Sequence, residues 1–233
     1  MSDAPLVAPF GASGFRGTDL AAVGLPSIDF SDGFMAAFDR HLRPRLDKRA
    51  DGFTTLFGAL SQRLGPLWIV ETGTLRVADN WSGDGQSSVM FDLFAQAETR
   101  RGRPVSFVSI DLAAASIAAA RAVCSHATSL VCNDSVHALH TLSRLVTGRR
   151  IDLLYLDSFD LDLTDPGPSA QHHLMELVAA APMLGSGSLV MVDDYDVPGV
   201  GAVGGKGLLV DAYLAAIDAV VLHSGYAKLW RIP

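Results

Sequence analysis

The sequence predicts an α/β fold: a doubly wound, mostly parallel sheet of seven strands that closes with a C-terminal antiparallel hairpin. Short, continuously apolar runs recur after residue 66, as in strands buried on both faces of a parallel sheet. Stretches with helical spacing of apolar residues separate these runs, and such alternation implies right-handed crossovers. Two further apolar runs near the end are separated by a short segment that contains Ser224-Gly225, which favours a hairpin at the sheet edge.

These patterns place each element along the chain. The strands of the parallel part are expected at 67–70, 105–110, 129–132, 151–156 and 188–192, and those of the hairpin at 220–222 and 227–230. The helices are expected at 86–100, 113–124, 135–146, 169–184 and 207–217.

The N-terminal part differs in composition. Residues 1–28 are rich in Gly, Pro and Ala and are expected to form an arm or lid. Helical spacing of Phe and Leu then continues to residue 64, with Ser31 or Asp32 as the expected N-cap and Pro44 as the end or kink of the first helix. We therefore expect one structural domain, in which residues 1–65 form an arm and helices on the substrate side and residues 66–233 form the core.

Composition limits the partners. Of the 233 residues 49% are hydrophobic, and the formal net charge is −7, which argues against nucleic acid as a partner. The basic residues from Arg40 to Arg49 are expected to lie on a solvated surface. No apolar segment is long enough to cross a bilayer, and Cys124 and Cys132 are expected to be buried free thiols. These features favour a cytoplasmic protein with a small-molecule partner, and leave a homo-oligomer open.

The residues after the first strand form the first candidate site. In an open α/β sheet, ligands bind beyond the carboxyl ends of the strands, where the winding reverses. The first strand is followed there by Glu71-Thr72-Gly73-Thr74. Glycine lets the backbone approach a ligand closely, and the glutamate can accept hydrogen bonds from one.

A second glycine-containing turn leads into the next helix. It contains Gly85, Gln86, Ser87 and Ser88, and the backbone N–H groups of such a helix N-terminus suit a carboxylate or a phosphate. A purely structural turn with serine as its N-cap is equally compatible with this pattern.

Acidic residues follow the second and third strands. Asp111, with Leu112 beside it, is placed to accept hydrogen bonds from the ribose hydroxyls of an adenosine cofactor. Asp134 and Ser135 follow the third strand, where a side chain can bond an adenine amino group. Asp111 or Ser135 can instead cap the helix that follows it. Together with the first glycine, they appear in the order that a nucleoside crevice requires.

The run Glu71-Thr72-Gly73-Thr74-Leu75-Arg76 resembles the E-T-G-x-x-R form of the first motif in sugar O-methyltransferases of the macrocin and novobiocin type. The resemblance to these class I S-adenosylmethionine-dependent methyltransferases extends over residues 67–232. It implies a Rossmann-like methyltransferase fold and S-adenosylmethionine as the cofactor, bound by the residues after the first three strands.

Carboxylates gather after the fourth and fifth strands. Asp157, Asp193 and Asp194 are expected to meet at one edge of the sheet, where oxygen ligands suit Mg²⁺, Ca²⁺ or Mn²⁺. The resemblance implies that these three bind magnesium, which chelates hydroxyls of the sugar. In the alternative interpretation they cap helices or bind water, and Asp157 alone contacts the methionine amino group.

The remaining catalytic candidates are histidines. His172 and His173 begin the helix after Asp157, and a histidine can deprotonate a hydroxyl acceptor. The two point about 100° apart on a helix, so we expect only one to face the crevice. The alternative for both is packing or helix capping.

A glycine-rich segment, 199–207, follows the aspartate pair and is expected to form a mobile flap. Its Lys206 can bind an anionic acceptor, although a solvated lysine is the simpler expectation.

Three functions remain in view. The first is O-methylation of a hydroxyl on a sugar or natural product, with or without a metal. A nicotinamide-dependent oxidoreductase is disfavoured because GxGxxG is absent. A non-catalytic protein that binds S-adenosyl ligands does not need the acidic clusters.

Overall fold

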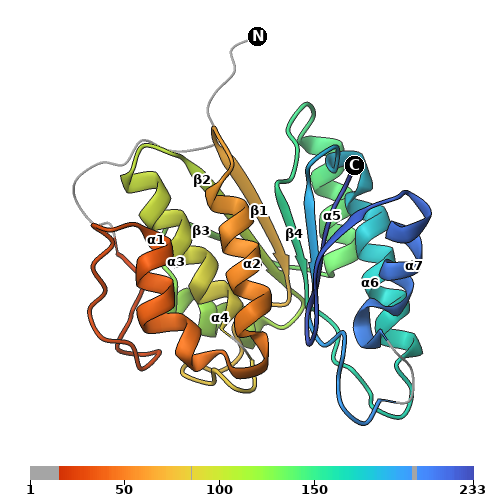
Figure 1. Cartoon of the computed structure of the whole chain (residues 1–233), viewed down its shortest axis with the longest axis horizontal. Coiled ribbons are helices and arrows are strands. Elements are labelled where there is room, and N and C mark those ends of the chain that lie inside the picture. Colours follow the sequence, from red (N-terminus) through yellow and green to blue (C-terminus); the bar gives the residue numbers. More distant parts are fainter. Residues whose placement is uncertain (1–15, 85, 201–203) are drawn as a thin grey trace.

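The computed structural model describes residues 16–84, 86–200 and 204–233. Its sheet has seven strands in the order β3-β2-β1-β4-β5-β7-β6 (Figure 1). The first five strands are parallel, and β7 lies antiparallel between β5 and β6. The mostly parallel sheet with a C-terminal hairpin is confirmed. The strands are β1 (Leu67–Thr72), β2 (Val105–Asp111), β3 (Thr128–Cys132), β4 (Leu153–Leu156), β5 (Leu189–Val192), β6 (Val220–Ser224) and β7 (Lys228–Arg231).

Helices cover both faces of the sheet and produce three layers (Figure 1). The first four helices share one hydrophobic core cluster with the sheet, and the last three share the other. The winding reverses between β1 and β4, so the fold is doubly wound, as predicted. The helices are α1 (Phe34–Ala37), α2 (Ala50–Ser61), α3 (Ser87–Arg100), α4 (Ala114–Val123), α5 (Ser135–Leu145), α6 (Gly167–Ala180) and α7 (Leu208–Ala216).

Strand β1 shows why a parallel strand has a continuously apolar sequence. Leu67 and Ile69 lie in the first core cluster, whereas Trp68 and Val70 lie in the second. Successive side chains of a strand point to opposite faces, and here both faces are covered by helices.

The N-terminal helices pack into the main core. Phe34 of α1 lies 4.7 Å from Phe57 of α2 and 5.0 Å from Phe94 of α3, measured between ring centroids. Aromatic pairs at this separation add to the stability gained from burying the rings. The helices before residue 65 are therefore an integral part of the packing. The lid role of the preceding arm stays a prediction, and residues 1–15 lie outside the described part.

Two local expectations were wrong. Helix α1 has Gly33 as its N-cap with no side-chain hydrogen bond, so neither Ser31 nor Asp32 caps it. Cys132 is exposed, whereas Cys124 is buried as expected. Pro44 does mark a break: it lies in a 3₁₀ turn after the π-helical turn that continues α1.

Among the described residues, none of the helices combines the length and the apolar composition needed to cross a membrane.

The core contributions of two leucines four residues apart should differ sharply. Leu60 is completely buried, whereas Leu64 is 96% exposed. We expect Leu60→Ala to lower the free energy of unfolding by about 2–5 kcal/mol, because it leaves a cavity. Leu64→Ala should change it by less than about 0.5 kcal/mol. Urea denaturation of both variants measures the difference, and equal losses would contradict this packing.

Candidate functional site

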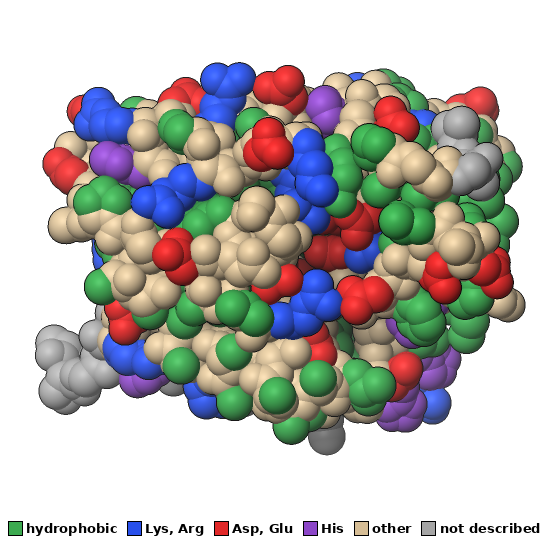
Figure 2. Space-filling model, turned by 90° about the horizontal axis from the view of Figure 1, so that it is seen from below, with side chains coloured by type: hydrophobic (Ala, Val, Ile, Leu, Met, Phe, Trp, Pro, Cys, Tyr) green, Lys and Arg blue, Asp and Glu red, His purple; other side chains and the backbone are tan. Residues whose placement is uncertain are grey.

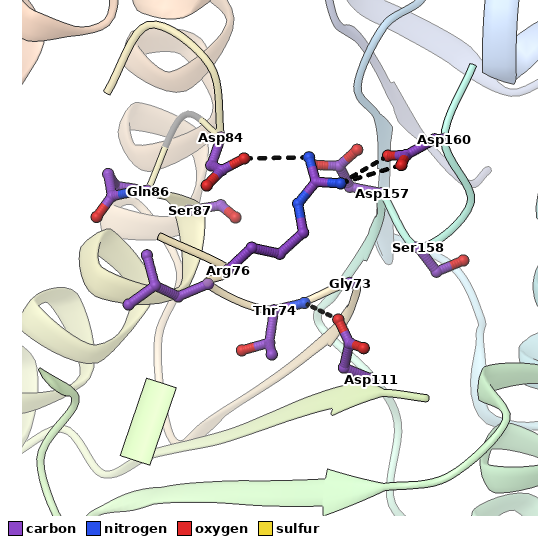
Figure 3. Close-up of a pocket in the computed structure, with 11 residues that line it drawn as sticks. Gly73, Thr74, Arg76, Asp84, Gln86, Ser87, Asp111, Asp157, Ser158 and Asp160 are labelled. Atoms are coloured by element: carbon purple, nitrogen blue, oxygen red, sulfur yellow. Dashed lines mark hydrogen bonds and ion pairs between the residues drawn. The ribbon is translucent and has the colours of Figure 1, made fainter. Parts of the chain in front are cut away.

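The polar residues that follow the strands lie at one edge of the sheet. Seen from this edge, the molecule has a hollow lined by carboxylate side chains, with basic side chains beside them (Figure 2). A pocket lies between the carboxyl ends of β1 and β4, where the winding reverses. Figure 3 shows the residues that line it: Gly73, Thr74, Leu75, Arg76, Asp84, Gln86, Ser87, Asp111, Asp157, Ser158 and Asp160.

Gly73 allows the β1 turn to approach β4. Its φ is +81°, and a Cβ atom there would lie 2.4 Å from the carbonyl oxygen of Asp157. Both the left-handed backbone and the close approach require glycine. The turn is thereby held against the residue that ends β4, and this forms the floor of the pocket.

Asp111 connects the β2 end to the same turn. Its Oδ2 accepts a hydrogen bond from the backbone N–H of Thr74 at 3.1 Å (Figure 3), and its Oδ1 accepts one from Ala113 at 2.7 Å. The N-cap of α4 is Ala113, so Asp111 is not the cap that the alternative interpretation expected. Leu112 beside it is 73% exposed and leaves an apolar surface next to the carboxylate.

Glu71 lies beneath the pocket instead of on its wall. Its side chain is fully buried and accepts hydrogen bonds from Ser87 at 2.6 Å, Ser88 at 2.6 Å and Ser109 at 2.5 Å. Burial raises its pKa to about 7, against the serine hydrogen bonds that lower it. Glu71 therefore supports the site by joining β1, β2 and α3. Thr72 next to it is also completely buried.

The turn before α3 is built by Gln86. Its backbone is left-handed with φ 54°, and its side-chain amide donates a hydrogen bond to the carbonyl of Val77 at 2.8 Å. Ser87 and Ser88 then form the first turn of α3, as predicted. Gly85 lies outside the described residues.

Arg76 crosses the pocket. Its guanidinium bonds Asp84 at 3.1 Å on one side and Asp160 at 2.9 Å on the other (Figure 3). The side chain is 51% exposed, so these ion pairs are screened by water. The contact joins the loop after β1 to the loop after β4.

At the end of β3, Asp134 caps α5 by accepting a hydrogen bond from the backbone N–H of His137 at 2.8 Å. Ser135, which was the predicted alternative cap, is instead the first residue of the helix, and its hydroxyl contacts Nε2 of His172 at 3.0 Å. The N-cap is therefore Asp134, and the alternative expectation of Ser135 as the cap was wrong.

The two histidines lie in different surroundings. His172 is partly exposed, and its Nε2 also lies 3.4 Å from Glu176, a contact that raises its pKa. His173 is fully buried, and its Nδ1–H donates to the carbonyl of Ser169 at 2.7 Å. Burial lowers the pKa of His173 to about 4, so the ring is neutral near pH 7. Of the pair, His172 is therefore the one that solvent or a ligand can reach.

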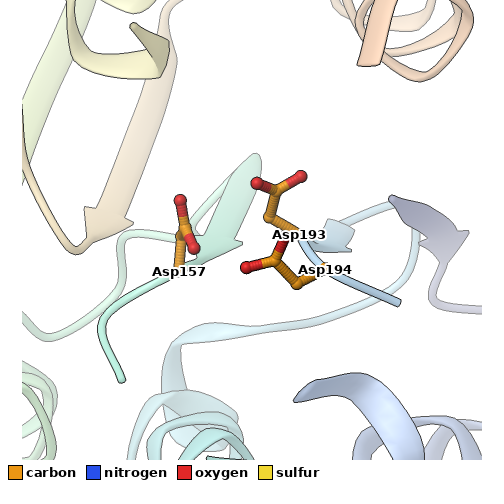
Figure 4. A group of neighbouring side chains, drawn as sticks. All are labelled: Asp157, Asp193 and Asp194. Carbon is orange, nitrogen blue, oxygen red and sulfur yellow. The ribbon is translucent and has the colours of Figure 1, made fainter. Parts of the chain in front are cut away.

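The three predicted carboxylates do converge. Asp157, Asp193 and Asp194 each offer an oxygen atom, and these atoms lie within 4.8 Å of one another (Figure 4). Buried carboxylates this close repel one another unless positive charge lies among them.

Two basic residues provide that charge. Nζ of Lys206 lies 2.5 Å from Asp157 and 3.0 Å from Asp194, and Nε of Arg49 donates to Asp193 at 2.7 Å. Their side chains are only 2% and 4% exposed. The expectations of a solvated Lys206 and a solvated Arg49 were both wrong.

The spacing of apolar residues around Arg49 in the sequence indicates that its side chain is buried. Leu46, Arg49, Phe53 and Leu56 recur at helical spacing, so the arginine belongs to the apolar face of the helical segment. Lys206 has no such pattern, and only the glycines on both sides of it mark the position. Glu176, which accepts a hydrogen bond from Ser158 at 2.6 Å, was also missed.

Burial of Glu71 makes a prediction about stability and pH. Because its pKa rises from 4.5 to about 7 on folding, the folded chain should lose stability as the pH rises from about 4.5 to 7. Glu71→Gln should remove up to about 3 kcal/mol of this pH dependence. Urea denaturation between pH 5 and 8 measures it, with Glu98→Gln in helix α3 as the control for losing a carboxylate. Parallel pH profiles for wild type and Glu71→Gln would contradict the prediction.

No family model and no curated protein matches the chain. Among solved structures it is similar to the apo form of CalS11, a TDP-rhamnose 3'-O-methyltransferase of calicheamicin biosynthesis, with 18% identity and a TM-score of 0.51 over 77% of this chain and 76% of that one. A second CalS11 structure gives 16% identity and a TM-score of 0.53 over 95% and 99%.

MycE, a methyltransferase of the mycinamycin pathway solved in complex with Mg and SAH, gives 13% identity and a TM-score of 0.50 over 81% of this chain and 53% of that one. The strand order, the antiparallel hairpin and these similarities together show that the chain has the fold of class I methyltransferases.

Proposed function

We propose that the chain is an S-adenosylmethionine-dependent methyltransferase that methylates a hydroxyl group of a small molecule, a sugar or a natural product. The observation that carries this proposal is the turn at Gly73, hydrogen-bonded through Thr74 to Asp111 and lying directly over Asp157. Such an arrangement brings a close backbone approach and carboxylates together at the switch point of the sheet, where nucleoside cofactors bind.

In this proposal the nucleoside lies along the ends of β2 and β3. Asp111 accepts hydrogen bonds from the ribose hydroxyls, and the exposed side chain of Leu112 packs against the adenine. Asp134 and Ser135 lie at the far end of the adenine ring. Because Asp134 is already the N-cap of α5, its remaining oxygen is the one left for a ligand.

The methionine part then lies over the β1 turn. The backbone of Gly73 and Thr74, with Gln86 and Ser87 at the N-terminus of α3, suits the carboxylate of the amino acid. Asp157 is positioned to accept a hydrogen bond from the ammonium group of the methionine part. Glu71 and Ser88 act from beneath by holding this turn, and the carbonyl of Thr72 accepts a hydrogen bond from the backbone N–H of Asp157. Gly85 is proposed as a cofactor-binding residue from its position in the sequence alone.

The chemistry is a displacement in which the acceptor oxygen attacks the sulfonium methyl group, the carbon–sulfur bond breaks and S-adenosylhomocysteine leaves. The hydroxyl proton must pass to a base. Asp157 and His172 are the candidates, since burial removes His173 from contact with an acceptor. Alignment of the two reactants supplies the rest of the rate acceleration.

Two features support a small hydroxylated acceptor. CalS11 is a TDP-rhamnose 3'-O-methyltransferase, and the second CalS11 structure matches this chain over 95% of its length. In addition, Oδ1 of Asp193 is buried with no hydrogen-bond partner among the described residues. A hydroxyl that reaches the acidic cluster can satisfy it.

Cofactor binding tests the proposal directly. Calorimetric titration should show that S-adenosylmethionine and S-adenosylhomocysteine bind and that NAD does not. Asp111→Asn should weaken both by about tenfold to a hundredfold, because charged hydrogen bonds to the ribose are lost. Asp51→Asn, at a 79% exposed surface ion pair, is the matched control. Absence of binding by either sulfur ligand would refute the proposal.

The proton acceptor can be identified from the pH dependence of turnover. A base works when deprotonated, so if His172 is the base, kcat should rise with pH through a midpoint above 6.5, because Glu176 raises its pKa. His172→Gln should lower kcat and abolish this limb, whereas the exposed His140→Gln should not. An unchanged pH profile in His172→Gln would leave Asp157 as the base.

A further inference from the structure

The resemblance to macrocin-type enzymes implies a divalent cation on Asp157, Asp193 and Asp194. The three fit such an ion by ligand chemistry, because they are carboxylates and their oxygen atoms lie within 4.8 Å of one another. The contacts that these carboxylates already make, however, do not fit a bound divalent ion. Each of the three already has an ion-pair contact with Lys206 or Arg49.

Lys206 holds the position between two of the carboxylates. Its Nζ lies 2.5 Å from Oδ1 of Asp157 and 3.0 Å from Oδ2 of Asp194. A metal ion bound to the same two oxygens would lie within about 4 Å of the ammonium, and two positive charges at that distance repel strongly in a buried site. The ammonium and a divalent ion therefore compete for one place.

Arg49 completes the neutralisation from the other side. Its Nε donates to Oδ2 of Asp193 at 2.7 Å, and its Nη2 lies 3.7 Å from Oδ1 of Asp194. Tyr226 adds a hydroxyl that donates to Oδ1 of Asp194.

The backbone fixes Lys206 in this place. A Cβ atom at Gly205 would lie 2.0 Å from the carbonyl oxygen of Asp194, and one at Gly207 would lie 2.7 Å from the ring of Tyr195. The backbone N–H of Lys206 itself donates to the carbonyl of Asp194 at 3.2 Å. Glycine on both sides thus lets this turn press against the end of β5, which brings the lysine in among the carboxylates.

We propose that Lys206, with Arg49, takes the place of the divalent cation at this edge of the sheet, so that the chain acts on its acceptor without a metal. The proposal rests on the proposed function for the reaction, but its electrostatic part does not depend on it. An ammonium has three N–H donors, and two of those of Lys206 are accounted for by Asp157 and Asp194. The third can donate to the acceptor oxygen and hold it beside the unpartnered Oδ1 of Asp193.

Binding of Mn²⁺ to the full chain, followed by electron paramagnetic resonance, tests the electrostatic part without any assay of methyl transfer. Wild type should bind no Mn²⁺ at this site. Lys206→Met removes the competing charge at nearly constant length and should gain one Mn²⁺ per chain, with an affinity at least tenfold above the detection limit of the titration. Lys228→Met is the matched control, because that lysine is ion-paired to Asp211 at 2.8 Å; it should behave as wild type.

Two outcomes would overturn the proposal. One is stoichiometric binding of Mn²⁺ by wild type that disappears in Asp193→Asn. The other is a Lys206→Met chain with a native circular dichroism spectrum that gains no Mn²⁺ binding. If Lys206→Met does not fold, the wild-type titration and its Asp193→Asn control still decide, because they require no change at Lys206.

Methyl transfer in EDTA separates this proposal from the proposed function. If wild type binds S-adenosylhomocysteine and turns over a hydroxylated acceptor equally with and without EDTA, both stand. Loss of turnover in EDTA that Mg²⁺ restores overturns the role of Lys206 and leaves the methyltransferase intact. Failure to bind S-adenosylhomocysteine refutes the proposed function. In that case the Mn²⁺ titration still tests whether Lys206 excludes a metal.

Discussion

The ion pairs among Arg49, Lys206 and the three aspartates at the ends of β4 and β5 are the interaction on which the arrangement of the site depends. Asp193 is completely buried and the other two are partly buried, and carboxylates in such surroundings are tolerated only with positive charge beside them. The two cations come from segments far apart in sequence, one before α2 and one before α7. The cluster therefore joins the N-terminal helices, the centre of the sheet and the glycine turn into one unit.

The fold could be predicted from the sequence because its pattern is local. The central parallel strands are apolar runs, such as residues 67–70 of β1, covered on both faces, and the helices between the strands follow helical spacing. The same holds for Gly73 and Asp111, since the carboxyl ends of the strands are known once the strands are placed. These positions depend on sequence order and not on the details of packing.

What could not be predicted depends on contacts between distant residues. Glu71 has the sequence context of a ligand-binding residue, and only the hydroxyls of Ser87, Ser88 and Ser109 show that it is a buried support. Lys206 lies in a glycine-rich stretch that resembles a solvated flap, and its burial follows from the fit of that turn against Asp194. The local sequence around a lysine that is flanked by glycines does not indicate which carboxylate the lysine pairs with.

Strand β7 has a consequence for how the chain reaches its final structure. It pairs with β5 on one side and with β6 on the other, although β6 precedes it in sequence. During synthesis, the edge of β5 stays open until β7 emerges, and β6 has no neighbour in the sheet before then. The order of assembly is thereby dictated by connectivity: a nascent chain that contains every parallel strand still presents an unpaired backbone edge, which a chaperone or another chain can bind.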